Sequence, residues 1–369
     1  MKVAAFNAKN LGQKKVTDKT VVHYLTKVSM VSSVQHCWAH GRQRNVQGKD
    51  KGHGMCFLQI MSRYSVVVIL EVMDKSGEAM EKLLQELNSA GNNRQHPYSM
   101  IASRQLGRDT YKEQFVCFYR EEDLKLKACH QYEDNQAGDE DAFAREPFIL
   151  HFSCPTAAVK NLVLIPVHTK PDDSEKELDE LHDVVKAVRR KWKTDNIMIL
   201  GDFNADGRYL SKKKKRDIRI NSAPYHWLIE DEVDTTSSNL NDNTYDRIVV
   251  YGQTMLDAIV PGSAKSFNFQ TEFKLSDEET LSISDHYPVE VELKSRQRDE
   301  APRKRRMAVP RATNRTSIKG QTQKKAPQKK KKAKLAGPQK KENAAAKRKR
   351  GRPLATSNTP TKRRRQDKR

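Results

Sequence analysis

The chain alternates short apolar runs with longer stretches in which apolar residues recur every three or four positions. Runs of four to eight residues rich in Val, Ile, Phe and Tyr predict β-strands. They are the segment that opens the chain at Met1, Ser65–Leu70, Phe115–Tyr119, Phe148–Phe152, Leu162–Val167, Ile197–Leu200, Arg247–Val250 and Val289–Leu293. In the last run Glu290 and Glu292 alternate with apolar residues, which predicts a sheet with one face in water.

Two segments have the apolar period of an amphipathic helix. They are Gly77–Leu87, with Met80, Leu83, Leu84 and Leu87 on one face, and Ser174–Trp192, with Leu178, Leu181, Val184, Val185, Val188 and Trp192. Many strands with a few long helices predict an α/β fold of packed sheets with helices outside.

Polar side chains stand where the strand-like runs end or begin. They are Asn7, Glu71, His168, Asp202 and Asn204 after such runs, and Asp246, Asp285 and His286 before them. Taken singly, each residue is typical of a turn or a helix cap. Together they favour the hypothesis that they converge on one rim of a sheet sandwich.

The motif GDFNAD carries the densest group of these residues. If the segment is extended, Asp202 and Asn204 point to the same side and Phe203 points into the core. Asp206 is expected to be a turn residue before Gly207.

The chemistry of this set is that of phosphodiester hydrolysis. Carboxylate and amide oxygens suit Mg²⁺ or Mn²⁺ rather than zinc. Two histidines with carboxylate partners suit proton transfer.

Charge divides the chain into two parts. Residues Ser295–Arg369 hold 29 of its 69 Lys and Arg but 4 of its 47 Asp and Glu, a net charge of +25, which leaves 40 basic and 43 acidic residues in Met1–Lys294. The tail has no Trp, Tyr or Phe and is therefore expected to be disordered alone. The first 294 residues are long enough for one large domain.

The five cysteines form no CxxC pair, so no disulfide framework is expected and a reducing compartment is favoured. No apolar run approaches the ~20 residues of a membrane span. The first residues read as a strand rather than a signal peptide, although removal of a signal peptide stays open.

The ordered motifs AAFNAKNLG, SRYSVVVILEVMD, LGRDTYKEQF, AFAREPF, IPVHTKP, GDFNAD, TYDRIVV and SDHYPVEVEL resemble the deoxyribonuclease I family, in particular its gamma-type branch. The resemblance runs from Met1 to Lys294 with one interruption. It implies a four-layer α/β sandwich of two packed mixed sheets flanked by helices. It also implies metal-dependent cleavage of DNA to 5′-phosphate ends, with Mg²⁺ or Mn²⁺ at the site and Ca²⁺ in structural sites.

The resemblance assigns roles residue by residue. Asn7, Glu71, Asp202, Asn204 and Asp285 form the metal-and-phosphate end of the site. His168 and His286 are the acid and base, with Glu113 and Asp246 as their partners. Tyr111 and Arg145 match DNA-contacting positions, the arginine as a bidentate phosphate clamp. Asp141 and Asp234 resemble carboxylates of the calcium sites.

The sequence also departs from the family pattern. Gly207 stands where secreted relatives carry a cysteine, and Asn243 or Thr244 stands where its partner is expected, so the family disulfide is absent. Met73 replaces a basic residue, and Asp109 replaces a neutral amide beside Tyr111. Both changes are expected to weaken DNA contacts by the domain.

The largest departure is an insertion at Ser29–Ile60. Joining Val28 to Met61 restores a helical face of Val21, Leu25 and Val28 that leads into the Glu71 strand. The insertion either loops out or breaks the element that positions Glu71. It holds Cys37, His40, His53 and Cys56, a spacing compatible with zinc, but it is also compatible with translated non-coding sequence.

The tail contains Arg350-Gly351-Arg352-Pro353, which resembles an AT-hook that lays Arg350 and Arg352 in the minor groove. Its basic runs are Arg303–Arg306, Lys329–Lys332, Lys347–Arg350 and Lys362–Arg365. They predict nuclear import signals or nonspecific DNA contacts. Heparin or membrane binding by a secreted form is the alternative.

These observations predict a monomeric, nuclear, divalent-metal-dependent DNA endonuclease tethered to DNA or chromatin by its tail. Three alternatives stay open. They are a catalytically impaired chromatin-binding protein, a secreted gamma-type deoxyribonuclease, and a phosphoesterase of the same fold acting on lipid or nucleotide.

Overall fold

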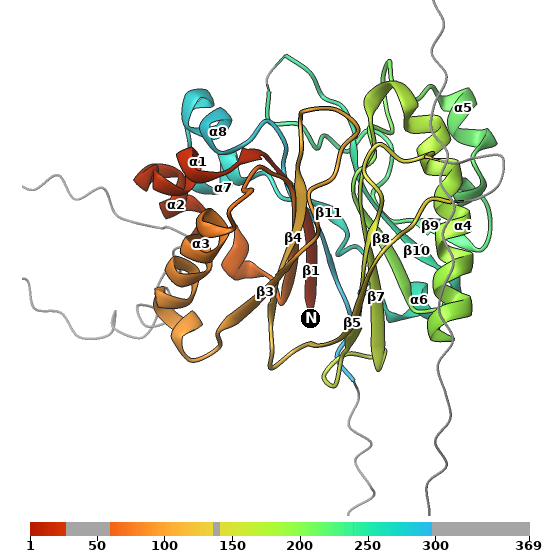
Figure 1. The fold of residues 1–369 in the computed structure, drawn as a ribbon, viewed down its shortest axis with the longest axis horizontal. Helices are drawn as coiled ribbons and strands as arrows, with labels where there is room; N and C mark the ends of the chain where they lie inside the picture. The colour runs from red at the N-terminus through yellow and green to blue at the C-terminus, as the bar shows by residue number, and fades with distance from the viewer. Residues whose placement is uncertain (27–59, 136–140, 239, 297–369) are drawn as a thin grey trace, which may run out of the picture. The chain divides into compact units, whose positions relative to one another are not determined.

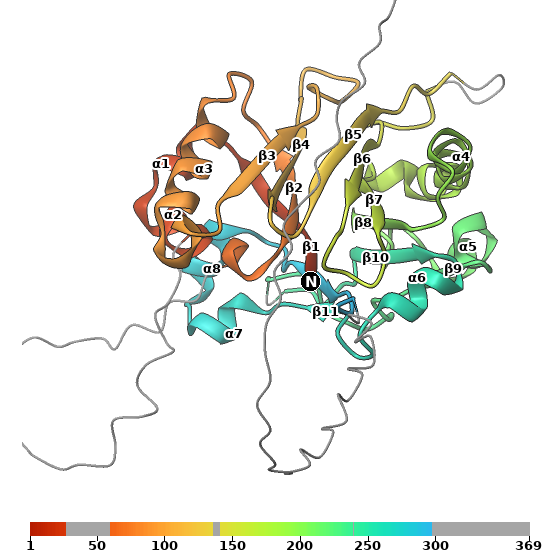
Figure 2. The ribbon, with the colours of Figure 1, turned by 90° about the horizontal axis from the view of Figure 1, so that it is seen from below.

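The structure is a computed structural model that describes residues 1–26, 60–135, 141–238 and 240–296. Two six-stranded sheets form its centre, and both mix parallel and antiparallel strands. The first sheet has the order β11-β12-β1-β2-β4-β3 and the second the order β5-β6-β7-β8-β10-β9. Figure 2 shows the two sheets facing each other between the two helical layers. The predicted four-layer α/β sandwich is confirmed.

The strands of the first sheet are β1 (Lys2–Leu11), β2 (Val66–Val72), β3 (Tyr98–Ala102), β4 (Gln114–Arg120), β11 (Lys265–Ser266) and β12 (Val289–Glu292). Those of the second are β5 (Lys125–Gln131), β6 (Phe148–Ser153), β7 (Asn161–His168), β8 (Ile197–Asp202), β9 (Tyr225–Trp227) and β10 (Asp246–Tyr251). All eight strand-like runs of the sequence correspond to strands, although Ser65 and Leu293 lie just outside them. The pattern missed β3, β5, β9 and β11, which are the outermost strands of the two sheets and are less continuously apolar.

The helices are α1 (Gln13–Thr17), α2 (Lys19–Thr26), α3 (Glu78–Ser89), α4 (Ser174–Trp192), α5 (Lys212–Asp217), α6 (Gly252–Ala258), α7 (Phe269–Phe273) and α8 (Asp277–Ile283). The two predicted helices are α3 and α4. Figure 1 shows α1, α2, α3, α7 and α8 beside the first sheet and α4 and α5 beside the second. No described helix is both long and apolar enough to cross a membrane.

Three apolar clusters separate the four layers. Side chains of both sheets, such as Val68 and Leu164, form the central cluster. The second cluster lies between the first sheet and its helices, and the third lies between the second sheet and α4. Because both faces of each sheet are covered, the central strands are apolar nearly throughout.

One expectation for β12 is wrong. Glu290 was predicted on a face in water, but it is 1% exposed. The Tyr64 hydroxyl donates a 2.8 Å hydrogen bond to it, and Arg63 lies at 3.3 Å. Arg63 and Tyr64 therefore supply the partners that a buried carboxylate needs. The alternation of apolar and polar residues in β12 gives no sign of these partners, because they come from another part of the chain.

Most of the insertion, and the zinc-compatible residues in it, lie outside the described residues. Ile60, placed at its end by the sequence, is fully buried in the cluster between the first sheet and its helices. It precedes a 3₁₀ turn at Met61–Arg63 that leads into β2 and contacts α2. The bounds of the insertion stay a prediction. The basic tail from residue 297 also lies outside the described residues.

Candidate active site

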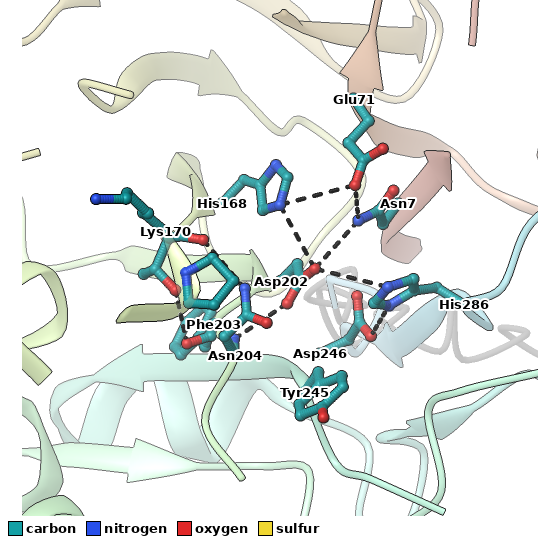
Figure 3. Close-up of polar contacts among 12 residues, drawn as sticks. Asn7, Glu71, His168, Lys170, Asp202, Phe203, Asn204, Tyr245, Asp246 and His286 are labelled. Carbon is teal, nitrogen blue, oxygen red and sulfur yellow. Dashed lines mark hydrogen bonds and ion pairs between the residues drawn. The ribbon is translucent and has the colours of Figure 1, made fainter. Parts of the chain in front are cut away.

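The site lies where the parallel strand pairs of the two sheets end. β1 runs parallel to β2 and brings Asn7 and Glu71 to the carboxyl end of the first sheet. β7 runs parallel to β8 and brings His168 opposite Asp202 in the second. Figure 3 shows these four side chains pointing toward one another. The sequence hypothesis that strand-end residues converge is therefore confirmed for these strands.

Asp202, 2% exposed, is the centre of the group. Its Oδ2 accepts a 3.1 Å hydrogen bond from Asn7 Nδ2. The same oxygen lies 3.7 Å from His168 Nε2 and 3.8 Å from His286 Nε2. One carboxylate oxygen therefore faces two imidazoles that arrive from different sheets.

Glu71 completes this arrangement. Its Oε1 accepts a 2.8 Å hydrogen bond from Asn7 Nδ2 and lies 3.8 Å from His168 Nε2. The β1–β2 register shifts here, and Glu71, Lys9 and Asn10 adopt positive φ values of 53°, 41° and 55°. Such a bulge re-aims side chains at the cost of backbone strain. It turns Glu71 toward the site.

Each histidine is held by a buried carboxylate. His168 Nδ1 lies 2.6 Å from Glu113 Oε1, and His286 Nδ1 lies 2.8 Å from Asp246 Oδ2. These contacts fix each ring so that Nε2 faces Asp202. The structure thus brings together both pairs that the family resemblance implied.

The pKa values follow from these contacts. Burial alone would lower the pKa of His286, but the charges of Asp246 and Asp202 raise it to about 10. Burial raises the pKa of Asp246 to about 6, against the opposing effect of His286. For His168, burial acts to lower the pKa, and the charge and hydrogen bond of Glu113 outweigh it and raise it. Each imidazole therefore binds a proton more tightly than the side chain of an isolated histidine does.

The charge on Asp202 depends on the same imidazoles. Burial acts to raise the pKa of Asp202, but His286 and His168 outweigh it and lower the pKa. Asp202 is therefore ionised at neutral pH. It lies within a group, Asp202, Asp246 and His286, whose possible ligand atoms are all within 4.8 Å of one another.

The GDFNAD motif is only partly as predicted. Phe203 is buried as expected, but β8 ends at Asp202, and Asn204 has a φ of 46° rather than an extended conformation. The Asn204 side chain instead donates to Thr169 O at 3.0 Å, while its backbone N–H donates to Asp202 Oδ1. Asn204 therefore braces Asp202 and the chain just after His168.

Asp206 does more than form a turn. Its Oδ1 accepts from Gly207 N at 2.7 Å, as a turn residue would, and its Oδ2 accepts from Thr244 N at 2.9 Å. Gly207 adjoins Asn243, whose Oδ1 lies 2.9 Å from where a Cβ on Gly207 would be. The two loops meet where the family disulfide would lie, and the Asp206 carboxylate links them.

Asp285 stands apart from the Asp202 group. Its Oδ2 pairs with Lys9 Nζ at 2.7 Å, and its side chain is 36% exposed. The preceding Ser284 is fully buried and donates from its hydroxyl to Asn7 O at 2.6 Å. Ser284 Oγ also accepts from His286 N at 3.1 Å. This serine ties His286 to β1, a role that the sequence did not indicate.

Tyr111 and Arg145 flank the His168 side of the site. Tyr111 is 41% exposed, and its hydroxyl donates to Asn10 Oδ1 at 3.0 Å. Arg145 Nε lies 2.8 Å from Glu113 Oε1, and Nη1 donates to His168 O at 3.2 Å. Much of the guanidinium fork predicted to clamp phosphate is thus already engaged in positioning Glu113 and His168.

The two candidates for calcium sites have local partners of their own. Asp141 has a φ of 60° and pairs with Arg108 Nε at 3.0 Å, while Asp234 accepts from the Thr236 hydroxyl at 2.8 Å. Met73 and Asp109 are exposed, as expected of surface positions. Arg350 and Arg352 lie outside the described residues. The calcium and AT-hook assignments stay predictions.

The sequence analysis missed Glu177 in the first turn of α4. Its Oε1 accepts from Ala144 N and from Lys170 N, both at 3.2 Å. These groups adjoin Arg145 and follow His168 by two residues, so one buried carboxylate joins both segments. Burial raises the pKa of Glu177 to about 7, against the opposing effect of those two N–H groups. The helical period already places Glu177 on the face of Leu181 and Val184, four and seven residues before them, which is the signal that could have indicated its burial. Only the fold shows which groups it bonds.

The chain is similar in sequence to known nucleases. Residues 45–286 match the model of the endonuclease/exonuclease/phosphatase family. Rat deoxyribonuclease gamma is 40% identical over 266 residues, which is 71% of this chain and 85% of the relative. Human deoxyribonuclease gamma is 36% identical over 296 residues, 80% of this chain and 86% of the relative. Rabbit deoxyribonuclease-1 is 36% identical over 295 residues, 79% of this chain and 92% of the relative.

The chain therefore belongs to the endonuclease/exonuclease/phosphatase family, in its deoxyribonuclease I branch. The resemblance stated from the motifs is confirmed.

Glu177 gives a testable pH dependence. Its raised pKa means that the stability contributed by its proton is fully present below pH ~4.5 and is lost as pH rises through about 7. We expect Glu177→Gln to remove this loss. The difference in free energy of unfolding between the variant and the natural chain should therefore shift by ~3 kcal/mol in favour of the variant between pH 4.5 and 8.

Urea unfolding at several pH values, in chelator, measures this difference. Glu81→Gln, at an exposed position of α3, is the control and should show no such trend. A difference for Glu177→Gln that does not change with pH would contradict the assignment.

Proposed function

We propose that this chain is a divalent-metal-dependent endonuclease that hydrolyses DNA phosphodiester bonds to leave 5′-phosphate ends. The observation that carries the proposal is the pair of carboxylate-held imidazoles whose Nε2 atoms face one buried aspartate from two sides. Membership of the deoxyribonuclease I branch supports DNA as the substrate.

The donor set fits a hard divalent cation. Glu71 Oε1 and Asp202 Oδ2 offer two carboxylate oxygens that meet at Asn7 Nδ2, and no thiolate takes part among the described residues. The Asn7 amide oxygen, which accepts from Lys9 N at 3.0 Å, would have to turn toward this point to join them. Mg²⁺ or Mn²⁺ held there would neutralise phosphate charge and polarise the P–O bonds. We assign the metal-binding role to Glu71, Asn7 and Asp202, with Asn204 supporting Asp202 and Asp285 at the edge of the site.

The protein side chains divide the proton transfers. His286 has a pKa of about 10, so it is protonated at neutral pH and can give its Nε2 proton to the leaving 3′ oxygen. His168 can accept a proton at Nε2 from the attacking water, because Glu113 stabilises the imidazolium that forms. Lys9, near Asp285, and the exposed Tyr111 lie where a DNA backbone would approach.

This mechanism predicts specific losses of activity. EDTA should abolish nicking of supercoiled plasmid by the full chain. His168→Ala and His286→Ala should each lower kcat by ~10²–10⁴ with little change in DNA affinity, because each removes a positioned acid or base. The measurement is the rate of plasmid nicking with Mg²⁺ and Ca²⁺ present.

His96→Ala is the matched control, since His96 is an exposed histidine paired with Glu122 away from the site. Nicking in excess chelator would refute the metal requirement. A natural chain that binds DNA but does not nick it would favour the catalytically impaired alternative.

We further propose that the basic tail tethers the enzyme to DNA or chromatin and addresses it to the nucleus. The part ending at Lys294 has 40 basic and 43 acidic residues, a net charge of −3, whereas the remaining 75 residues carry +25. A polyanion is repelled weakly by the first and attracted strongly by the second. Import receptors would read the basic runs, and Ca²⁺ would serve structural sites near Asp141 and Asp234.

The tail proposal predicts a strong dependence of binding on salt. With ~6–10 phosphate contacts, the full chain should lose ~10³–10⁵ in affinity between 50 and 200 mM salt, because each contact releases condensed counterions. A chain ending at Lys294 should bind weakly, with a shallow slope, and still cleave at saturating DNA. Arg352→Ala should reduce preference for A·T-rich duplex beyond a uniform loss.

Salt titrations of both chains on A·T-rich and G·C-rich duplexes, with imaging of each in cells, measure these effects. Equal slopes, or nuclear accumulation of the shortened chain alone, would overturn the role given to the tail.

A further inference from the structure

The catalytic domain carries a basic helix of its own. In α5 (Lys212–Asp217), five basic residues follow one another, and the Ser211 hydroxyl caps the helix by accepting from Lys214 N at 3.3 Å. Two of the five are engaged within the fold. Lys214 pairs with Glu175 at 2.8 Å, and Lys215 packs over the Trp227 ring at 4.2 Å and pairs with Asp231.

The other three basic residues of α5 form one free face. Lys212, Lys213 and Arg216 are exposed, and no described carboxylate pairs with them. Residues three and four apart lie on the same side of a helix, so Arg216 is next to both lysines. Three cations without local partners on one rigid face fit the phosphates of a polyanion.

A short segment connects this face to the active site. The chain leaves β8 at Asp202, passes Asn204 and reaches Lys212 eight residues later. Eight residues span at most ~30 Å, the rise of about nine base pairs of DNA. Figure 1 shows α5 at the upper end of the helical layer beside the second sheet, and β1 runs upward from the N-terminus to the same end.

A row of side chains leads from the active site toward α5. The His286 and Tyr245 rings have centroids 6.3 Å apart, and those of Tyr245 and Tyr209 are 5.5 Å apart. The guanidinium of the exposed Arg208 lies 4.8 Å from the centroid of the Tyr209 ring. The row therefore extends from the catalytic histidine to Arg208, four residues before Lys212, and ends in a cation. The Asp206 carboxylate beside it is engaged by Gly207 N and Thr244 N.

We propose that Lys212, Lys213 and Arg216 bind backbone phosphates of the same duplex that is cut at His168 and His286, within about nine base pairs of the scissile bond. This inference rests on the proposed nuclease function and adds a second contact region to it. The contact lengthens the duplex footprint of the catalytic domain and is independent of the tail.

A basic run of this kind also attracts nuclear import receptors. The fold favours DNA, because the run is locked into a capped helix and Lys215 is held between Trp227 and Asp231. A receptor that needs the run as an extended peptide would have to unfold α5, whereas phosphates can contact the free face as it stands.

Cleavage interference tests the contact on the full chain. Duplexes of about 40 base pairs, each with one neutral methylphosphonate, are nicked at subsaturating enzyme, and every product band identifies its own scissile phosphate. The natural chain should cut about 5- to 10-fold more slowly at bonds that place the neutral phosphate on α5, at about 0.1 M salt. In the variant Lys212→Ala/Lys213→Ala/Arg216→Ala this slowing, which appears as a dip in the profile of cutting rate against position, should be absent. The neutral phosphate should then have no effect on the cutting rate at those bonds.

The matched control removes three exposed lysines at the opposite end of the second sheet, as Lys125→Ala/Lys127→Ala/Lys160→Ala. It should retain the dip. Alanine preserves helix propensity in α5, and circular dichroism with a glutamine version of the variant confirms that the fold persists.

The outcomes distinguish failure of the proposed nuclease function from failure of the proposed DNA contact at α5. No cleavage by the natural chain would refute the proposed nuclease function. Cleavage with an interference profile that is the same in the natural chain and the α5 variant would refute the DNA contact. An unchanged profile with loss of nuclear accumulation would refute it in favour of an import receptor.

Discussion

The site depends on keeping a charged carboxylate, Asp202, buried where two sheets meet. An unpaired carboxylate in such a place would be neutralised by a shifted pKa. Here Asn7 donates a hydrogen bond to it, the Asn204 backbone donates another, and two imidazoles face it. The negative charge of Asp202 stabilises the protonated form of each imidazole and keeps His286 protonated at neutral pH. The imidazoles in turn lower the pKa of the carboxylate.

The arrangement of the strands brings these groups together. β1 and β2 are parallel neighbours in the first sheet, and β7 and β8 are parallel neighbours in the second, so four strands end at the same rim. Glu113, just before β4 of the first sheet, pairs with His168, and Asp246, at the start of β10 of the second sheet, pairs with His286. Links such as Ser284 to Asn7 and Asp206 to Thr244 hold the loops in place without a disulfide among the described residues.

How far the sequence predicts this structure depends on the range of each interaction. Apolar runs located the central strands, and the polar residue after each run located Asn7, Glu71, His168 and Asp202. The histidine pairings came from the family resemblance, since nothing in the spacing of Glu113 and His168 indicates contact. Residues whose role arises from distant chain segments escaped prediction, as with Glu177, Ser284 and the buried Glu290. Backbone conformation also escaped it: the positive φ of Glu71 accompanies a shift in register of β2 against both neighbouring strands, and that of Asn204 follows the end of β8.

The central claim is that His168 and His286, from different sheets, act on one phosphate. A double-mutant cycle on kcat tests it most directly, using His168→Ala, His286→Ala and the combined variant. If the two act as a unit, the combined loss should exceed the larger single loss by no more than about tenfold. Losses that multiply in full, as for independent sites, would contradict the account.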